Sequence, residues 1–496
     1  MPNLPESALL TQEHMALFVD YYELTMGQAD LDSNNNSICT ENYFARAIPQ
    51  GEYLISAGLE QVIHYILNLR FSEDNLQWLQ SSKSIPEISP RFIDYLRNFK
   101  FDGDVYAVPE GTVVFPNEPI INITGRSIDI QLFETYLLSI MNFQTLIATK
   151  ASRIVNVSEG RTCFDFGARR AHGRDAAVLS ARASFIGGIS ATSLMIASRY
   201  FGIPYVGTLA HKFIQDRGGE LEAFRDYAMS FPHNTILLID TYDTIQGAKY
   251  AVTIGQEMKA DGQKLVGVRL DSGNLLELSK QVRSILDSGG LQETKIFASN
   301  DLDEFEIDRL LKSNAPLDGF GIGTRLATGA TLDPVSGNSG VSALPGVYKH
   351  VEKIEGGKTI FTFKKSNDMA KSTLPAKKQV QRFTDPNQYC IKDRICLWNE
   401  IDRGGLLIPI IKKGKLVYDF PTLQEIQVKT QSNLSRLPNK HKTLYQPAVY
   451  PVVLSEKLKG LQQKLIKEKN QEHCSNNTDR TFFEIRSINE RKRHNP

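Results

Sequence analysis

The feature that most constrains the fold is a regular alternation of short apolar strands and helices through the middle of the 496-residue chain. Helical stretches such as TIQGAKYAVTIGQEM and LLELSKQVRSILDSGG separate the strand-like segments, whose spacing settles at about 30 residues. The segments begin near Thr162, Ile203, Thr235, Leu265, Lys295 and Asp318. This spacing is typical of β–α units in a parallel sheet. Because six units follow one another without a dinucleotide-binding fingerprint, the pattern favours a β/α barrel over an open sheet.

The regions on either side of this alternation have different patterns. Residues 1–150 predict a mixed α/β region that ends in a long apolar helix, and residues 151–349 hold the expected barrel. Residues 350–465 alternate like antiparallel strands with glycine turns and then return to an apolar helix. The polar, basic-leaning stretch 466–496 is expected to be a disordered tail. The fold class is therefore predicted to be α/β with a barrel at its centre.

Composition excludes several kinds of partner. The chain has 57 Lys and Arg against 56 Asp and Glu, so no global field attracts nucleic acid or a membrane surface. Its five cysteines are scattered without the spacing of a zinc or redox site, which is typical of a reducing compartment. The first residues do not resemble a signal peptide, and no apolar run is long enough to span a bilayer. We expect a cytoplasmic protein that binds neither nucleic acid nor membrane.

Chemically active side chains are concentrated where the expected strands end. In a β/α barrel the carboxyl ends of the strands face one rim, where functional residues collect. The residues at these positions are Gly167, Arg169, Arg170, Thr208, His211, Asp240, Asp243, Arg269, Asp271, Ser272, Gly273, Ser299, Asn300, Gly321, Gly323 and Thr324. A structural scaffold needs glycines for its turns, but it does not need several arginines, three carboxylates and a histidine on one rim.

The residue types at this rim match a phosphate-rich ligand. Arginine binds phosphate or carboxylate in a bidentate fork, and the Gly-Ile-Gly-Thr turn at 321–324 lets backbone N–H groups approach a phosphate closely. Asp240 and Asp271 offer the hard oxygens that Mg²⁺ prefers. The chain lacks a GxxxxGK[ST] loop, so any nucleotide would be held without Walker chemistry.

Each of these residues also has a purely structural interpretation. The arginine pair at 169–170 could form ion pairs with Asp165 and Asp175. Asp271 could cap the helix that follows it, and His211 could be a structural histidine. Their occurrence at successive strand ends argues against all of these explanations holding together.

A series of motifs resembles the nicotinate phosphoribosyltransferase family. In chain order these are DYYELTMGQA, ISAGLEQV, YAVPEGTVVFPNEP, FQTLIATKASRIV, FDFGARRAHG, FIGGISATS, GTLAHKF, LIDTYDT, GVRLDSGN, FASNDLDE, GFGIGTRLATG, GVYKHVE, STLPAKKQV and VVLSEKL. They extend over roughly residues 15–465 in the order in which the family has them. A match of this length and order is specific.

The resemblance implies a type II phosphoribosyltransferase fold. This is an irregular β/α barrel with a second α/β sandwich domain built from the N- and C-terminal segments together. It also implies a homodimer with active sites at the subunit boundary. The family transfers the phosphoribosyl group of 5-phosphoribosyl 1-diphosphate (PRPP) to nicotinate, forming nicotinate mononucleotide and diphosphate in NAD salvage. ATP is the implied co-substrate, coupled through a phosphohistidine, and Mg²⁺ is the implied cofactor.

The same resemblance implies roles for individual residues. His211 would be the phosphohistidine, and Tyr22 would stack on nicotinate, from the neighbouring subunit. Arg169 and Thr208 would contact nicotinate or a phosphate. The expected phosphoribosyl and metal site comprises Arg269, Asp271, Ser272, Gly273, Ser299, Gly321, Gly323 and Thr324, with Asp240 as a further metal candidate and Thr373 as a further PRPP contact.

The choice of pyridine substrate is partly encoded in the stretch GGISATSL. The related nicotinamide enzyme places a carboxylate here to accept from the amide, whereas this chain has the hydroxyls of Ser190, Thr192 and Ser193. A carboxylate would repel nicotinate, so the stretch favours nicotinate, although Leu194 stands where the family usually has a polar residue. The alternatives are a nicotinamide or quinolinate phosphoribosyltransferase, or a non-catalytic sensor of phosphate ligands with the same fold.

Overall fold

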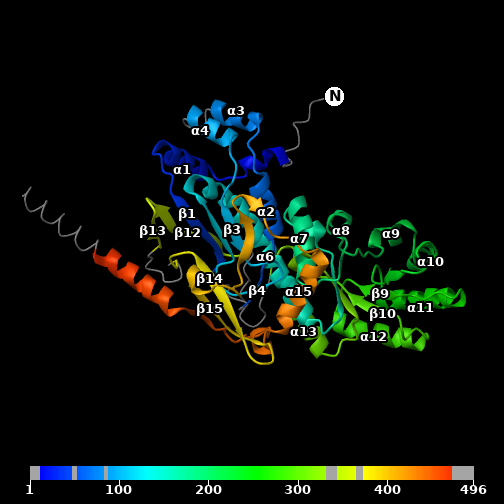
Figure 1. Ribbon diagram of the computed structural model, residues 1–496. Coiled ribbons are helices and arrows are strands. Elements are labelled where there is room, and N and C mark those ends of the chain that lie inside the picture. Colours follow the sequence, from blue (N-terminus) through cyan, green and yellow to red (C-terminus); the bar gives the residue numbers. More distant parts are fainter. Residues whose placement is uncertain (1–11, 47–52, 83–87, 331–342, 365–372, 472–496) are drawn as a thin grey trace, which may run out of the picture.

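The computed structural model describes residues 12–46, 53–82, 88–330, 343–364 and 373–471. These residues form a parallel and an antiparallel sheet of six and seven strands, with helices packed around them (Figure 1). Within the described ranges no helix is both long and apolar enough to cross a membrane.

The central part of the chain forms a curled parallel sheet with the spatial order β7-β6-β11-β10-β9-β8. The last strand in sequence, β11, pairs with the first, β6, so that the chain of strands returns towards its start. The sheet is not closed, because β8 lies at one edge and the other edge carries only a bridge between Thr192 and Tyr205. The expected irregular barrel is therefore confirmed. Its strands are β6 (Thr162–Asp165), β7 (Ala191–Thr192), β8 (Ile236–Leu238), β9 (Gly267–Leu270), β10 (Lys295–Ala298) and β11 (Gly319–Ile322).

One strand prediction is wrong. The other five strands begin within two residues of the predicted positions, but the segment from Ile203 forms no strand, and β7 takes the second place in the barrel instead. Pro204 lacks the N–H group that a ladder needs, and the Tyr205 side chain is 68% exposed. The apolar residues of this segment therefore belong to a loop at the edge of the sheet and not to a barrel strand.

Helices alternate with these strands. Three of them, α8, α9 and α10, lie between β7 and β8 in the sequence. In Figure 1 the barrel helices lie on the opposite side of the molecule from the antiparallel sheet. They are α7 (Arg174–Ile186), α8 (Met195–Phe201), α9 (His211–Asp216), α10 (Glu220–Ser230), α11 (Thr244–Ala260), α12 (Leu275–Ser288), α13 (Glu304–Lys312) and α14 (Thr324–Ala327).

Both ends of the chain contribute to the antiparallel sheet, whose order is β13-β12-β1-β5-β3-β16-β17. Strand β1 pairs with β12 along its whole length, although some 300 residues separate them in sequence. The expected joining of N- and C-terminal segments in one α/β layer is therefore present. The strands are β1 (Ile38–Ala45), β3 (Asp104–Ala107), β5 (Ile121–Arg126), β12 (Gly346–Glu355), β13 (Lys358–Phe361), β16 (Ile408–Lys412) and β17 (Lys415–Leu416).

The long helix α6 (Glu134–Val157) joins the two layers. Its first half buries Leu137 and Met141 in the core of the antiparallel sheet, and its second half buries Ile147 and Ile154 in the core of the barrel. At 1.5 Å per residue the helix spans about 36 Å. It therefore sets the position of the barrel relative to the N-terminal region.

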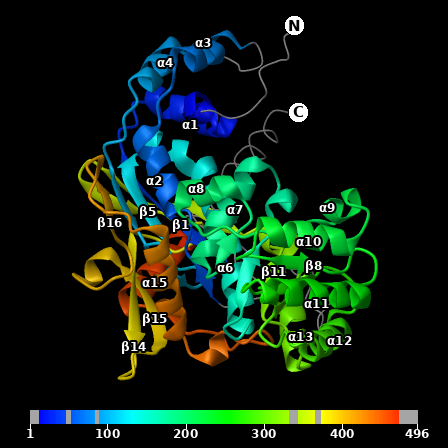
Figure 2. The same ribbon diagram turned by 90° about the vertical axis from the view of Figure 1, so that its right-hand side faces the viewer.

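The remaining elements complete the outer layers. In Figure 2 the N-terminal helices α1, α3 and α4 lie together, away from the barrel helices. A helix at 456–471 continues through the first residues of the predicted tail, and the rest of that tail, 472–496, lies outside the described residues. The elements are α1 (Tyr21–Asp32), α2 (Leu59–Asn68), α3 (Glu73–Ser81), α4 (Pro90–Arg97), α5 (Ser127–Ile130), α15 (Leu423–Ser435), the pair β2 (Leu54–Ile55) and β4 (Val113–Val114), and the sheet of β14 (Lys378–Thr384), β15 (Cys390–Leu397) and β18 (Val452–Leu454).

Candidate active site

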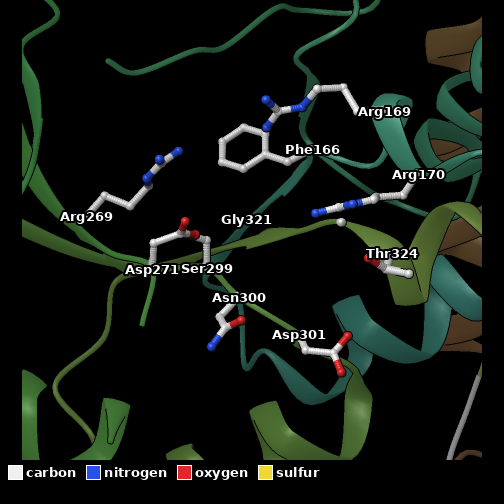
Figure 3. Close-up of a pocket in the computed structure, with 11 residues that line it drawn as sticks. Phe166, Arg169, Arg170, Arg269, Asp271, Ser299, Asn300, Asp301, Gly321 and Thr324 are labelled. Atoms are coloured by element: carbon white, nitrogen blue, oxygen red, sulfur yellow. The ribbon is translucent and has the colours of Figure 1, made fainter. Parts of the chain in front are cut away.

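A polar cavity of about 360 Å³ lies where the parallel strands end (Figure 3). Strands β6, β9, β10 and β11 and the loops that follow them supply its walls. The structure therefore brings together most of the strand-end residues that the sequence singled out. The lining residues are Phe166, Arg169, Arg170, Arg269, Asp271, Ser299, Asn300, Asp301, Gly321, Gly323 and Thr324.

The two arginines after β6 are available to an external anion. Within the described residues no carboxylate lies within 4 Å of the guanidinium of Arg169 or Arg170, so the ion pairs considered from the sequence do not form. Asp165 instead accepts from the backbone N–H of Gly167 at 2.8 Å and from the hydroxyl of Thr192 at 2.8 Å. Burial raises the pKa of this carboxyl. Asp165 thus shapes the turn that presents the arginines.

Arg269 approaches the same cavity from within β9. Burial lowers the pKa of its guanidinium, while Asp271 and Asp240 oppose the shift and Arg169 adds to it. Its Nε atom is buried without a hydrogen-bond acceptor among the described residues. Figure 3 shows the three arginine side chains grouped around Phe166, and the Arg269 guanidinium lies 5.9 Å from the centroid of that ring. An anionic ligand would offset the cost of burying this cation.

The two candidate metal ligands have different positions. The Asp271 carboxylate lines the cavity and accepts from the Ser299 hydroxyl at 2.5 Å. Asp240 lies behind it, where one carboxylate oxygen accepts from the backbone N–H of Asp271 at 2.9 Å and from the hydroxyl of Ser272 at 2.6 Å. The other oxygen of Asp240 is buried with no partner in the described part of the chain. Asp271 does not cap α12, because Asn274 has that role.

His211 lies beside the cavity without lining it. It is the first residue of α9, and its side chain is 40% exposed. Its Nδ1 atom is 3.0 Å from the hydroxyl oxygen of Thr241, and its Nε2 atom is 3.7 Å from a carboxylate oxygen of Asp271. The histidine is therefore next to the Asp271 carboxylate, which faces the cavity.

Gly321 allows Phe166 to form one wall of the cavity. A Cβ atom at position 321 would lie 2.4 Å from the Phe166 ring, closer than any non-bonded contact can be. Phe166 is a functional candidate that sequence reasoning missed, and so is Asp301, which pairs with Arg325 at 2.8 Å. Both lie within three residues of the carboxyl end of a barrel strand, and this position was the signal that could have identified them.

Several expected residues lie outside this cavity. Thr208 lines a small space inside the barrel with Phe166 and Arg269. Ser272 and Gly273 belong to the loop after β9 but do not line the cavity. Thr373 is buried, and its hydroxyl accepts from the backbone N–H of Lys364 at 2.8 Å.

The stretch at 190–193 and Tyr22, both expected to contact nicotinate, also do not line the cavity. Thr192 is buried and donates its hydroxyl to Asp165, so it has a structural bond where a ligand contact was expected. Ser190 and Ser193 are exposed but do not line the cavity. Tyr22 lies on α1, where burial and the carboxylates of Glu134 and Glu23 raise its pKa, and it does not line the cavity of its own chain.

A mainly apolar groove of about 1050 Å³ adjoins the polar cavity. Leu194, Ile196 and Tyr200 contribute to its wall, together with Phe18 and Phe143 from the N-terminal third of the chain. Arg169 lines both spaces and so marks their boundary.

The chain is similar to known proteins over almost its whole length. Models of the nicotinate phosphoribosyltransferase N-terminal domain, family and C-terminal domain match residues 17–142, 162–387 and 402–462. Nicotinate phosphoribosyltransferase pncB2 of Mycobacterium tuberculosis is 37% identical, with 90% of this chain and 92% of the relative covered. Nicotinate phosphoribosyltransferase of Bacillus subtilis is 38% identical, with 90% and 94% covered.

The fold of this chain is also found in solved structures. The crystal structure of human nicotinic acid phosphoribosyltransferase superposes with a TM-score of 0.77 at 26% identity, covering 90% of this chain and 99% of that one. Nicotinate-nucleotide pyrophosphorylase from Pyrococcus furiosus shares the fold, with a TM-score of 0.68 at 23% identity over 87% and 98% of the two chains. With its barrel, its arginine-lined cavity and these matches, the chain belongs to the nicotinate phosphoribosyltransferase family.

Proposed function

We propose that this chain transfers the phosphoribosyl group of PRPP to nicotinate, forming nicotinate mononucleotide and diphosphate for NAD salvage. The observation that carries the proposal is the convergence of three arginines, Asp271 and Ser299 on one cavity in a chain of this family. PRPP is strongly anionic, and guanidinium groups bind phosphate oxygens in a bidentate fork. Nothing in the geometry favours a nicotinamide enzyme or a non-catalytic sensor over this function.

The reaction exchanges one bond at the anomeric carbon of the ribose. The bond to diphosphate breaks and its electron pair leaves with diphosphate, while the lone pair of the pyridine nitrogen forms the new C–N bond. Negative charge therefore grows on the leaving group in the transition state. Arg169, Arg170 and Arg269 surround the cavity where this charge would develop. Phe166 offers the pyridine ring a flat aromatic face in the same cavity.

Mg²⁺ fits this site as a partner of the diphosphate. Asp271 presents a hard carboxylate to the cavity, and the buried oxygen of Asp240 has no partner among the described residues. The described ranges contain no group of three or more His, Cys, Asp or Glu side chains that could hold a metal alone. Substrate oxygens would therefore complete the coordination. The ion would add positive charge beside the leaving group.

We further propose that ATP phosphorylates His211. A ring nitrogen uses its lone pair to form a bond to the γ-phosphorus, and the bond from that phosphorus to the bridging oxygen breaks as ADP leaves. Water later attacks the phosphorus, the N–P bond breaks, and inorganic phosphate is released. Because His211 is 3.7 Å from Asp271, the phosphoryl group would change the charge beside the PRPP site.

We also propose a homodimer with shared active sites. The apolar groove beside Arg169 is open, and exposed apolar side chains such as Ile196 and Tyr200 lie along it. Tyr22 does not line the cavity of its own chain. A contact between Tyr22 and nicotinate would therefore be made in the active site of the neighbouring subunit. The buried thiols of Cys39, Cys163, Cys390 and Cys396 are unpaired, which supports a reducing, cytoplasmic setting.

The proposed function is tested by measuring mononucleotide formation from PRPP with nicotinate, nicotinamide and quinolinate, each with and without ATP. We expect nicotinate to have the highest kcat/KM and ATP to stimulate its reaction. His211→Ala should remove this stimulation and the transfer of γ-phosphate to the protein, while the protein stays folded. Faster turnover of nicotinamide or quinolinate would contradict the substrate assignment, and wild-type labelling of the variant would reject the phosphohistidine.

Arg169→Ala is expected to raise KM for nicotinate by about tenfold, because a charge-assisted hydrogen bond contributes about 1.5–3 kcal/mol. Arg169 is the better candidate than Arg170 because it lines both the polar cavity and the adjoining groove. Steady-state kinetics of the two alanine variants compare them directly. Unchanged kinetics for Arg169→Ala with a raised KM for Arg170→Ala would transfer the role to Arg170.

A further inference from the structure

The loop that follows β8 touches both His211 and the loop that carries Asp271. At its centre, the Thr241 hydroxyl lies 3.0 Å from His211 Nδ1. The preceding residue, Asp240, accepts from the backbone N–H of Asp271 at 2.9 Å and from the Ser272 hydroxyl at 2.6 Å. Thr241, which contacts the histidine, and Asp240, which binds the cavity loop, are therefore adjacent in the sequence.

This loop also adjoins the start of α10. Glu220, the first residue of α10, is 4% exposed. Burial raises the pKa of its carboxyl, and the neighbouring backbone N–H groups of Thr241 and Tyr242 oppose that shift. Helix α10 follows directly on α9, which begins with His211. His211 and Glu220, which both lie next to the Thr241 loop, are therefore the first residues of two consecutive helices.

Phosphorylation would disturb this arrangement at a defined point. A phosphoryl group on the imidazole carries negative charge into a space where Nε2 is already 3.7 Å from the Asp271 carboxylate. Like charges at this distance repel, so either the ring or the carboxylate must move. Movement of the ring acts on Thr241, and through Asp240 on the N–H of Asp271 and on Ser272.

We propose that Thr241 and Asp240 are positioning residues that link the phosphorylation state of His211 to the loop at Asp271 and Ser272. This inference rests on the proposed ATP-coupled function. Neither residue needs to contact the reacting atoms for this role. Thr241 orients the imidazole for phosphoryl transfer, and Asp240 passes the change to the PRPP-binding loop. The ATP-independent reaction does not use the link.

Thr241→Val tests the link because it removes the hydroxyl at nearly constant volume. We expect the ratio of kcat/KM for PRPP with and without ATP to fall by about tenfold, the upper end for loss of one positioning hydrogen bond. Transfer of γ-³²P from ATP to the protein should slow by a similar factor. The ATP-independent rate should change less than about twofold, which is small compared with that expected loss.

Two further variants make the result specific. Thr241→Ser retains the hydroxyl and should restore most of the ATP stimulation. Thr253→Val makes the same exchange at an exposed position of α11, where the hydroxyl donates to the backbone carbonyl of Lys249, and should behave like wild type. Thermal melting followed by circular dichroism checks that each variant folds.

The outcomes separate this inference from the function on which it rests. If the wild type is neither labelled nor stimulated by ATP, the ATP-coupled function fails and the link fails with it. If the wild type is labelled but Thr241→Val retains its stimulation ratio, only the link is overturned. An equal loss of the ATP-independent and ATP-stimulated rates in Thr241→Val would also overturn it, because it would show general support of the site.

Discussion

Asparagine in place of Asp271 is expected to lower kcat/KM for PRPP by about 10²–10³-fold, the range seen when one preorganised electrostatic group is removed from an active site. Asp271 is the carboxylate that lines the polar cavity, and it is held there by the Ser299 hydroxyl. Asparagine keeps the shape but removes the charge that a metal–diphosphate complex would use. It also leaves one fewer acceptor oxygen for Ser299 and removes the negative charge that lies 3.7 Å from His211 Nε2.

Steady-state kinetics over a range of PRPP and Mg²⁺ concentrations measure this effect. The expected result is a fall in kcat/KM together with a higher Mg²⁺ requirement. Asp261→Asn is the matched control, because Asp261 is exposed at the end of α11, away from the cavity lining. An Asp271→Asn enzyme with wild-type kinetics would show that the metal–diphosphate complex does not depend on this carboxylate.

Methionine in place of Arg182 is expected to destabilise the fold by about 3–5 kcal/mol, the usual cost of leaving one partner of a buried ion pair uncompensated. Arg182 on α7 is fully buried. It donates to both carboxylate oxygens of Glu110 at 2.9 and 2.8 Å, to Gln144 of α6 at 3.1 Å and to Glu60 of α2 at 2.6 Å. This cluster ties α7, the helix that follows the cavity-lining Arg169 and Arg170, to the N-terminal region.

The pH dependence of this loss has a defined sign. Burial alone would raise the pKa of Glu110, but the Arg182 guanidinium and the N–H group of Gly58 outweigh it and hold the pKa below its ordinary value. In the wild type this group therefore contributes stability above its unfolded pKa of about 4.3, which is lost as pH falls through the folded pKa. Without Arg182 the Glu110 pKa should rise above the unfolded value. The variant should then lose stability as pH increases, and its deficit should be larger at pH 8 than at pH 5.

Urea unfolding at these two pH values measures the difference. Glu110→Gln combined with Arg182→Met should recover part of the loss, because the buried charge is then removed as well. Arg225→Met is the control, since Arg225 forms an exposed ion pair with Glu257, of a kind that contributes about 1 kcal/mol or less. Equal, small effects at positions 182 and 225 would contradict the assigned role of the buried cluster.

The rim of the barrel could be predicted because it depends on local pattern. A buried run such as TCFDFG ends in a turn that must carry Gly and polar residues, and parallel strands bring their carboxyl ends to one edge. This local pattern predicts that Arg169, Arg269, Asp271 and Ser299 lie together, and the cavity confirms that placement.

Other features could not be predicted because the same residue types can form several different contacts. The apolar run at Ile203 resembles a strand, but Pro204 and the position of Tyr205 at the barrel edge leave only a bridge. The motif around Thr192 predicts a ligand contact, but its hydroxyl donates to the Asp165 carboxylate. Phe166 became a wall of the cavity only through its close approach to Gly321, which lies 155 positions later in the sequence.

The sequence by itself determined the β–α alternation, the residue types at the strand ends and the family motifs, because each depends on short-range periodicity and turn chemistry. Only the tertiary structure decided which of these residues act together. It showed that Asp271 faces the cavity while Asp240 stands behind it, that Arg182 closes a buried cluster drawn from several helices and loops, and that Thr241 binds His211. The physical reason is that hydrogen bonds and charges act over about 3–4 Å in space, whatever the distance along the chain.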